Sequence, residues 1–346
     1  MRNPLSRWYV RLILWLIAIG IFCVWWPVRE MPHFIIEPQN RAKAFLQLAV
    51  FHGSWLLFPA MLEAALILWN RARRRHWRRA IGAALVLLLA LVGAWARFVE
   101  PNVLVVRTTV VPAPIDLNIA LVADVHVGLF TRPDKLRQLV DRLNAMHVDL
   151  VLFAGDLTYD PPRDLGAALA PLRKLDKPMY AVLGNHDVQL PGPPLQAKIR
   201  AALADSPVTF IEHRVLDFPK FRLAGLHDYW TALDDADFLR KLPNDKPLLI
   251  LMHQPHTLRK LHGVRFALAM AGHTHGGQVA LPWITAHVFK SVRDEIYIDG
   301  LYRTPQGELF VTSGVGVTGT PVRFDCPSRI DLLELRRSAA PAAPTH

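Results

Sequence analysis

The chain has 346 residues, 52% of them hydrophobic, and its 40 Lys and Arg against 29 Asp and Glu give a formal net charge of +11. This length predicts two or three folded units. The first 114 residues hold 14 of the basic and 4 of the acidic residues, so the charge belongs almost wholly to the first third. Because it lies between long apolar runs, it indicates membrane topology, and the near-neutral remainder argues against a nucleic-acid partner.

Three apolar runs fill the first hundred residues, at about 9–26, 44–69 and 80–98. Each can reach the roughly 20 residues that span a bilayer, the first only just. We therefore predict a membrane anchor over residues 1–100 with three transmembrane helices. The first run ends in Trp25-Trp26-Pro27 instead of small residues, which favours an uncleaved signal anchor over a cleaved signal peptide.

The arginines predict the orientation of this anchor. Six arginines lie between residues 70 and 79, which should keep that loop in the cytoplasm together with the basic amino terminus. The loop between the first two runs is less basic and is predicted outside. Three crossings then place everything after Phe98 outside the cytoplasm, so we expect a multi-pass inner-membrane protein whose larger domain is periplasmic.

Two ionisable residues and one of the two cysteines lie inside these apolar runs. His52 and Glu63 lie within the second run, where they either mark a functional site or, as we favour, face neighbouring helices or an interface. Cys23 and Cys326 are far apart in the chain, so no disulfide and no cysteine-based metal site is predicted.

Short apolar runs alternate with helical patterns in the domain predicted over residues 101–337. Strands are predicted at 119–123, 150–153, 179–183, 208–211, 221–226, 248–252 and 266–271, and helices at 134–146, 165–175 and 197–203. This alternation indicates a layered α/β domain, in which ligands gather beyond the carboxyl ends of the strands. The Ala- and Pro-rich tail at 338–346 is predicted to be disordered.

The most informative stretch is 271–278, where His273 and His275 stand two residues apart between glycines. In an extended segment this spacing points both imidazoles to one side, as a metal site requires. Further polar residues follow other predicted strands, and the full set is Asp124, His126, Asp156, Asn185, His253, His273 and His275. Each alone could be a helix cap, a turn residue or a buried histidine. Together they favour two ions of Mn, Fe or Zn that share a bridging carboxylate, about 3.5–4 Å apart.

These segments resemble the calcineurin-like metallophosphoesterase superfamily. The likeness rests on Asp124-x-His126, Gly155-Asp156, Gly184-Asn185-His186-Asp187, His253 and Gly272-His273-x-His275. Gly276-Gly277-Gln278 and Pro321-Val-Arg323-Phe resemble its membrane-associated bacterial YkuE/YaeI-like branch. The resemblance implies a four-layer α-β-β-α sandwich, here preceded by the three transmembrane helices.

The resemblance also implies roles. Asp124, His126 and His275 would hold the first metal, Asp156 would bridge, and Asn185, His253 and His273 would hold the second. A hydroxide between the ions would attack phosphorus, His186 would donate a proton to the leaving oxygen or stabilise the phosphate, and Asp187 would orient His186. Asp160 could support the site or occupy a turn, and His227 and Asp228 could face the pocket.

The leading hypothesis is a membrane-anchored phosphoesterase with two divalent metals, acting on a phosphomonoester or phosphodiester of a lipid-linked or envelope substrate. The main alternative is a UDP-2,3-diacylglucosamine pyrophosphohydrolase of lipid A synthesis, but its nucleotide substrate is cytosolic and the predicted topology counts against it. A non-catalytic membrane sensor of metal or phospholipid is a second alternative, disfavoured by the complete ligand set. A nuclease is a third, disfavoured by the net charge of +1 after residue 114.

Overall fold

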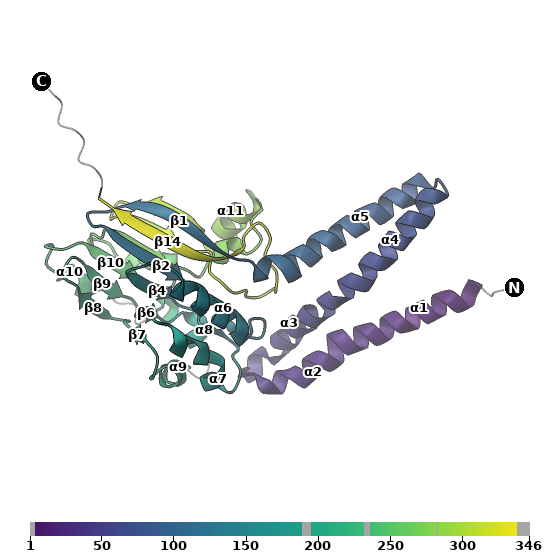
Figure 1. Cartoon of the computed structure of the whole chain (residues 1–346), viewed down its shortest axis with the longest axis horizontal. Helices are drawn as coiled ribbons and strands as arrows, with labels where there is room; N and C mark the ends of the chain where they lie inside the picture. The colour runs from purple at the N-terminus through teal and green to yellow at the C-terminus, as the bar shows by residue number, and fades with distance from the viewer. Residues whose placement is uncertain (1–3, 189–194, 232–235, 282, 338–346) are drawn as a thin grey trace, which may run out of the picture.

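Two six-stranded β-sheets form the body of the protein, and long helices project from one side of it (Figure 1). The structure, a computed structural model, describes residues 4–188, 195–231, 236–281 and 283–337. The tail predicted at 338–346 lies outside the described residues.

The first sheet is built on parallel strands that follow one another in the chain. Its order is β1 (Leu104–Pro112), β14 (Ser328–Arg336), β2 (Leu117–Val122), β4 (Leu150–Ala154), β6 (Met179–Val182) and β7 (Val208–Phe210). Strands β2, β4, β6 and β7 are parallel, and β14 runs antiparallel to β2 and parallel to β1.

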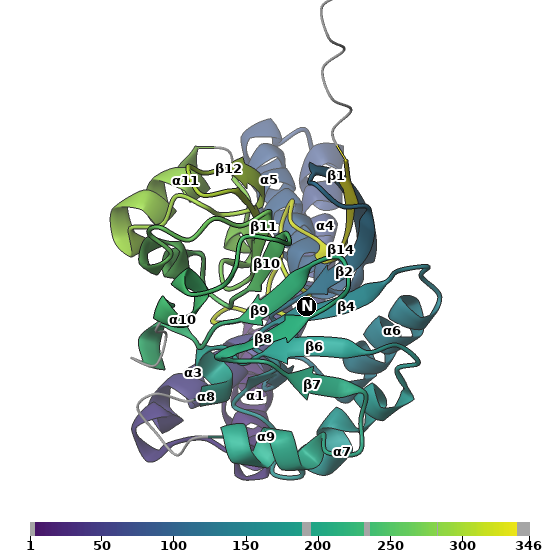
Figure 2. The same ribbon diagram turned by 90° about the vertical axis from the view of Figure 1, so that its left-hand side faces the viewer.

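The second sheet repeats this plan around a parallel centre. Its order is β12 (Gly300–Arg303), β13 (Glu308–Val311), β11 (Leu268–Ala271), β10 (Leu248–Leu251), β9 (Arg222–Gly225) and β8 (Arg214–Asp217). Only β8 and β12, at its two edges, pair antiparallel with their neighbours. Figure 2 shows the two sheets stacked, with helices on both outer sides.

Apolar side chains of both sheets meet between them. Leu121 and Leu152 of the first sheet and Leu251 and Phe310 of the second belong to one buried cluster. A second cluster lies under α6 (Pro133–Asn144), α7 (Leu165–Leu169) and α9 (Gln196–Ala202), and a third under α10 (Asp237–Arg240). The four-layer α-β-β-α sandwich is thereby confirmed.

The sequence-based prediction was wrong for one helix and missed several strands. The helix predicted at 165–175 is α-helical only to Leu169 and continues as a 3₁₀ helix over Ala170–Lys174, because Pro171 cannot donate a backbone hydrogen bond. Strands β1, β8, β12, β13 and β14 were not predicted. β14 is largely buried along its length, but Arg329 and Asp331 within it form an ion pair. These two charged residues interrupt the apolar pattern by which a buried strand is predicted.

Three continuous helical segments are long and apolar enough to cross a membrane: Tyr9–His33, Pro38–Arg73 and Trp77–Asn102. Their principal helices are α1 (Pro4–Ile19), α2 (Trp26–Glu30), α3 (Arg41–Gly53), α4 (Leu57–Arg73) and α5 (Trp77–Ala94). Large apolar side chains point outward from them, with Leu89 72% and Leu62 63% exposed. Such surfaces are stable in lipid, so these helices indicate membrane association.

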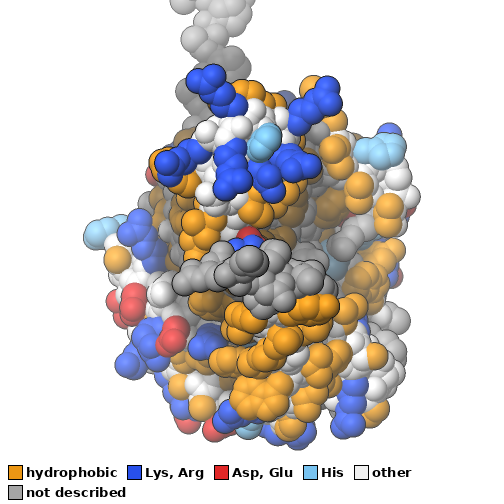
Figure 3. Space-filling model, turned by 90° about the vertical axis from the view of Figure 1, so that its right-hand side faces the viewer, with side chains coloured by type: hydrophobic (Ala, Val, Ile, Leu, Met, Phe, Trp, Pro, Cys, Tyr) orange, Lys and Arg blue, Asp and Glu red, His pale blue; other side chains and the backbone are white. Residues whose placement is uncertain are grey.

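Basic residues gather at the tip of the α4–α5 hairpin, farthest from the domain (Figures 1 and 3). Seen from this end, a blue cluster of Lys and Arg stands above the hydrophobic surface of the helices (Figure 3). The turn between the two helices holds Arg74 and Arg75.

The anchor and the domain are packed together. Ile35 donates its backbone N–H to Pro161 O at 2.8 Å, and on α3 Leu48 is fully buried against the domain. Within the anchor, His52 Nε2 lies 3.0 Å from Glu30 Oε2, and Trp15 Nε1 donates to Glu63 at 3.1 Å. His52 and Glu63 therefore contact neighbouring helices, as favoured from the sequence. Cys23 and Cys326 are both free thiols.

Candidate metal centre

The polar residues predicted as ligands come together where strands of both sheets end. Asp124 follows β2, Asp156 follows β4 and Asn185 follows β6, while His253 and His273 follow β10 and β11. Parallel strands deliver the residues after their carboxyl ends to one edge, which is why segments far apart in the chain meet here. Ligand atoms form two groups, Asp124, His126 and His275, and Asp156, His253 and His273, and within each group the atoms lie within 4.8 Å of one another.

The first group is buried, and its ligand atoms lie close together. Nε2 of His126 and Nε2 of His275 face each other at 2.9 Å, and Asp124 Oδ1 lies 3.7 Å from His275 Nε2. Asp124 Oδ1 is buried with no hydrogen-bond partner among the described residues. A buried carboxylate oxygen left unpaired beside two converging nitrogens is costly unless a cation binds between them, so this donor set fits a divalent metal.

The second group is joined to the first by one oxygen. Asp156 Oδ2 lies 3.3 Å from His253 Nε2 and 3.6 Å from His126 Nε2, so it faces both groups. This position fits the bridging role that the resemblance implies. Asn185 Oδ1 and His273 Nδ1 complete the group at 3.1 and 3.2 Å from His253 Nε2.

The backbone at this edge is held in an unusual conformation. Asp124, His126, Asp156, His273 and His275 all have positive φ, between 53° and 72°. Non-glycine residues rarely adopt this region, and such strain gathers at functional sites. Gly272 permits the packing, because a Cβ there would lie 2.5 Å from both Ala123 Cβ and Asp124 Oδ2.

Burial sets the protonation of the first group. It lowers the pKa of His126 to about 3 and that of His275 well below its usual value, so both rings are neutral, the form that binds metal. Burial also raises the pKa of Asp124 to about 8. For His253, burial works to lower the pKa, but the nearby carboxylate of Asp156 outweighs it and raises that pKa to about 10. Oxygen and imidazole donors of this kind suit Mn, Fe or Zn.

His186 and Asp187 lie beside the metal groups in different ways. The His186 ring, half-buried, lies 5.2 Å from the His126 ring between centroids, and its backbone N–H donates to Asp156 Oδ1 at 2.9 Å. Asp187 is fully buried and accepts hydrogen bonds from the backbone N–H groups of Leu157, Thr158 and Gly184. Its carboxylate ties the loops after β4 and β6 together, so any orienting effect on His186 acts through the backbone.

Asp160, Asp228 and His227 have different surroundings. Burial raises the pKa of Asp160 to about 6, while the charge of Lys43 lowers that pKa and the charge of Glu37 raises it. Asp228 is buried and accepts from Gln254 Nε2 at 2.9 Å, and Gln254 is next to His253 in the chain. The ring of His227 stacks on that of His213, 6.0 Å between centroids.

A cavity of about 890 Å³ opens beside both groups, and part of its lining was missed from the sequence. Lys43, from α3 of the anchor, lines it together with His186 and Tyr159. Gln47, one turn further along α3, donates to the Tyr159 hydroxyl at 2.8 Å. Lys43 was assigned only to a loop and Gln47 fell inside a predicted membrane span, so nothing local in the sequence pointed to the site.

Arg323 explains the motif Pro321-Val-Arg323-Phe. Its guanidinium is fully buried and donates to the backbone oxygens of Ser313, Gly316 and Cys326. Gly316 N–H in turn donates to Asp124 O at 2.6 Å. The arginine therefore supports the loop at 313–316, which in turn contacts the backbone of Asp124 in the first group.

Several known proteins are similar to this chain in sequence. Residues 117–277 match the family model of calcineurin-like phosphoesterases. A metallophosphoesterase of Helicobacter pylori (strain 26695) is 31% identical over 232 residues, 64% of this chain and 60% of that protein. The metallophosphoesterase YkuE of Bacillus subtilis is 25% identical over 285 residues, covering 77% of this chain and 98% of YkuE. The phosphodiesterase YaeI of Escherichia coli is 28% identical over 229 residues, covering 63% of this chain and 82% of YaeI.

Residues 117–277 form a calcineurin-like phosphoesterase domain, and the chain is similar to YkuE and YaeI. This confirms the resemblance found in the sequence. The chain spans 60% of the length of the Helicobacter relative.

Proposed function

We propose that the chain is a membrane-anchored phosphoesterase that uses two divalent metals to hydrolyse a phosphomonoester or phosphodiester of a lipid-linked or envelope substrate. The observation that carries this proposal is the shared cavity: both metal groups open into it, and Lys43 of the membrane anchor forms part of its wall. Tethering alone does not require a residue of the anchor in this cavity, so Lys43 supports a role for the anchor in substrate binding.

The residues divide the chemistry between them. Two bound cations would supply an activated water and offset charge on the phosphoryl oxygens. His186 lines the cavity beside the two metal groups, where its ring can donate a proton to the leaving oxygen. The Lys43 ammonium can pair with a non-bridging phosphate oxygen, since its side chain is exposed and forms no ion pair with any described residue.

An apolar helix on the other side of the cavity supports a lipid substrate. Phe289 and Val292 line the cavity, at the end of the helical segment that begins with α11 (Ile284–Val288). Large apolar side chains outside the cavity lining are exposed at the start of this segment, with Trp283 88% and Ile284 60% exposed. Figure 1 places α11 close to the base of α5. A substrate held in the membrane surface would meet apolar contacts here and the metal groups deeper in the cavity.

The predicted orientation is part of the proposal. The loop between the first two helical segments contacts the domain, whereas the basic turn after α4 lies at the opposite end. Positive loops stay in the cytoplasm, which supports a domain on the extracytoplasmic side of the inner membrane. A reporter fused after Leu335 tests this, because activity of a cytoplasmic reporter alone would favour the UDP-2,3-diacylglucosamine pyrophosphohydrolase.

Activity is tested with the full chain in detergent, stripped of metal and reloaded with Mn²⁺, using bis(p-nitrophenyl) phosphate. Turnover should require the metal and should fall by at least about a hundredfold in Asp156→Ala and His186→Ala. Asp176→Ala, a change at a residue remote from the cavity, serves as the control. Metal binding with equal turnover in all four proteins would contradict the proposal, and metal binding without any turnover would favour a sensor.

A further inference from the structure

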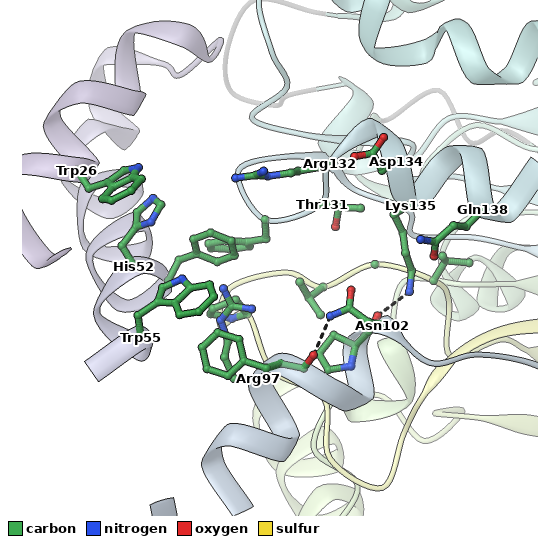
Figure 4. A pocket seen from close by; sticks show the side chains of 18 of the residues that line it. Trp26, His52, Trp55, Arg97, Asn102, Thr131, Arg132, Asp134, Lys135 and Gln138 are labelled. Atoms are coloured by element: carbon green, nitrogen blue, oxygen red, sulfur yellow. Dashed lines mark hydrogen bonds between the residues drawn. The ribbon is translucent and has the colours of Figure 1, made fainter. Parts of the chain in front are cut away.

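A second cavity, of about 620 Å³, lies between the domain-side ends of the membrane helices and the domain. One wall is aromatic and comes from all three helical segments, with Trp26, Phe51, Trp55 and Phe98 among its residues. The other wall comes from the start of α6 and the loop before it. Figure 4 shows the helices on one side and the polar residues Arg132, Lys135 and Gln138 on the other.

Arg97 stands in this cavity without a counter-charge. Its guanidinium carbon lies 4.0 Å from the ring centroid of Phe51 and 4.8 Å from that of Phe98. Its Nε is buried and has no hydrogen-bond partner, and no carboxylate among the described residues forms an ion pair with it. Aromatic faces hold the cation in place but leave its donors free for an anionic ligand.

Two more cations face the same space. Lys135 is buried, and its ammonium donates hydrogen bonds to two neutral oxygens, Pro101 O at 2.6 Å and Ser328 Oγ at 3.2 Å. Arg132 is exposed and its guanidinium points across the cavity toward the helices (Figure 4). The acidic lining residue Asp134 is paired with Arg137 at 2.7 Å. The lining therefore carries an excess of positive charge.

The depth of the cavity identifies the source of its ligand. At about 1.5 Å per residue, the helix from Trp77 to Arg97 spans about 30 Å, the thickness of the hydrocarbon core. Since Trp77 follows the arginine-rich turn at one membrane surface, Arg97 lies at the level of the opposite headgroups. Trp26 and Trp55 beside it are the aromatic residues typical of that level.

This cavity is separate from the catalytic pocket. Phe130 lines the first and Tyr159 the second, and the two rings stack with centroids 6.0 Å apart. The loop at 315–321 likewise contributes Val315 to Val317 on one side and Thr318 to Thr320 on the other. A lipid bound beside Arg97 is thus screened from the metal groups.

We propose that this cavity binds the phosphate of an anionic phospholipid from the leaflet that faces the domain, with Arg97, Arg132 and Lys135 as its cationic contacts. The aromatic wall packs against the glycerol and first acyl carbons. The lipid is a resident ligand that braces the anchor against the domain and is not hydrolysed. The proposal requires the chain to sit in a membrane but does not require it to be an enzyme.

The test is native mass spectrometry of the full chain in detergent, titrated with dioleoyl phosphatidylglycerol or dioleoyl phosphatidylcholine. We expect one tightly bound phosphatidylglycerol, with phosphatidylcholine bound at least about tenfold more weakly. Arg97→Gln should weaken phosphatidylglycerol binding by about tenfold, and Arg132→Gln by a smaller factor. Arg97→Lys keeps the charge and should retain most of the binding. Arg79→Gln, at the other end of α5, is the matched control and should leave it unchanged.

Three results would overturn the proposal. They are unchanged phosphatidylglycerol binding in Arg97→Gln, displacement of the lipid by excess inorganic phosphate, and hydrolysis of the bound lipid by the metal-loaded chain. Melting temperatures identify a variant that fails to fold, and in that case Arg132→Gln, at an exposed position, decides. Asp156→Ala should bind the lipid normally, which separates this proposal from the catalytic one.

Discussion

Gln47 of α3 donates a hydrogen bond to the hydroxyl of Tyr159 at 2.8 Å. The ring of Tyr159 lies edge-on to His186, with 4.6 Å between centroids, and to His126 at 5.6 Å. One hydrogen bond thus separates a helix of the anchor from the proposed proton donor and from a metal-binding histidine. The anchor should therefore affect the geometry of the site as well as its location.

Replacing Gln47 by Leu tests this coupling. The change leaves the buried Tyr159 hydroxyl without its donor, which should cost about 1–2 kcal/mol of unfolding free energy and lower kcat by about three- to tenfold. Tyr159→Phe removes the other partner. If the hydrogen bond transmits the effect, the double variant should lose less than the sum of the two single losses in kcat. Strict additivity would show that the two residues act independently.

Lys43→Gln tests the proposed phosphate contact. Loss of one charge-assisted contact should lower kcat/KM for bis(p-nitrophenyl) phosphate by about tenfold, with metal content and melting temperature unchanged because the side chain is exposed. Lys220→Gln, at an exposed lysine outside the cavity lining, is the matched control. An unchanged kcat/KM in Lys43→Gln would remove Lys43 from the substrate site.

Metal content distinguishes the two groups of ligands. Because Asp156 Oδ2 faces both His126 and His253, Asp156→Ala should weaken binding of both ions. His273→Ala removes a ligand of the second group only, so the variant should retain close to one ion per chain. Elemental analysis after dialysis against a weak chelator measures the ratio, and two retained ions in Asp156→Ala would exclude a bridging position.

The sequence predicted the site residues that a local pattern marks, and it missed those whose contacts lie far away in the chain. The seven ligand positions lie directly after strands, so a local pattern was enough to find them, and the structure brings all seven to one edge. The positions that were missed act over long distances: Gln47 meets Tyr159 across 112 residues of chain. Its polar side chain stood in a run read as lipid-facing, and only the tertiary packing of α3 on the domain reveals its contact.

The same reasoning applies to Arg323. As part of a short motif it supported only a family resemblance, because a buried guanidinium that binds backbone oxygens has no pattern in hydropathy. We expect Arg323→Met to cost about 3 kcal/mol of unfolding free energy, since it leaves several buried carbonyl groups unpaired. Arg337→Met, at an exposed arginine, should be nearly neutral. Thermal unfolding compares them, and an equal melting temperature in both variants would contradict this account.

Trp283 offers a test of the substrate class that leaves the metal groups untouched. It is 88% exposed beside the helical segment that lines the cavity, so a soluble substrate gains nothing from it. Trp283→Ser should lower turnover of a phospholipid presented in vesicles by about tenfold, because it removes an apolar aromatic contact with the membrane interface. Turnover of the soluble substrate bis(p-nitrophenyl) phosphate should stay as in the parent, because this substrate is not held in the membrane surface. Val110→Ser, at an exposed apolar residue of β1, controls for surface polarity. If both substrates lose activity equally, Trp283 acts on the fold of the pocket, and the argument for a substrate in the membrane surface fails.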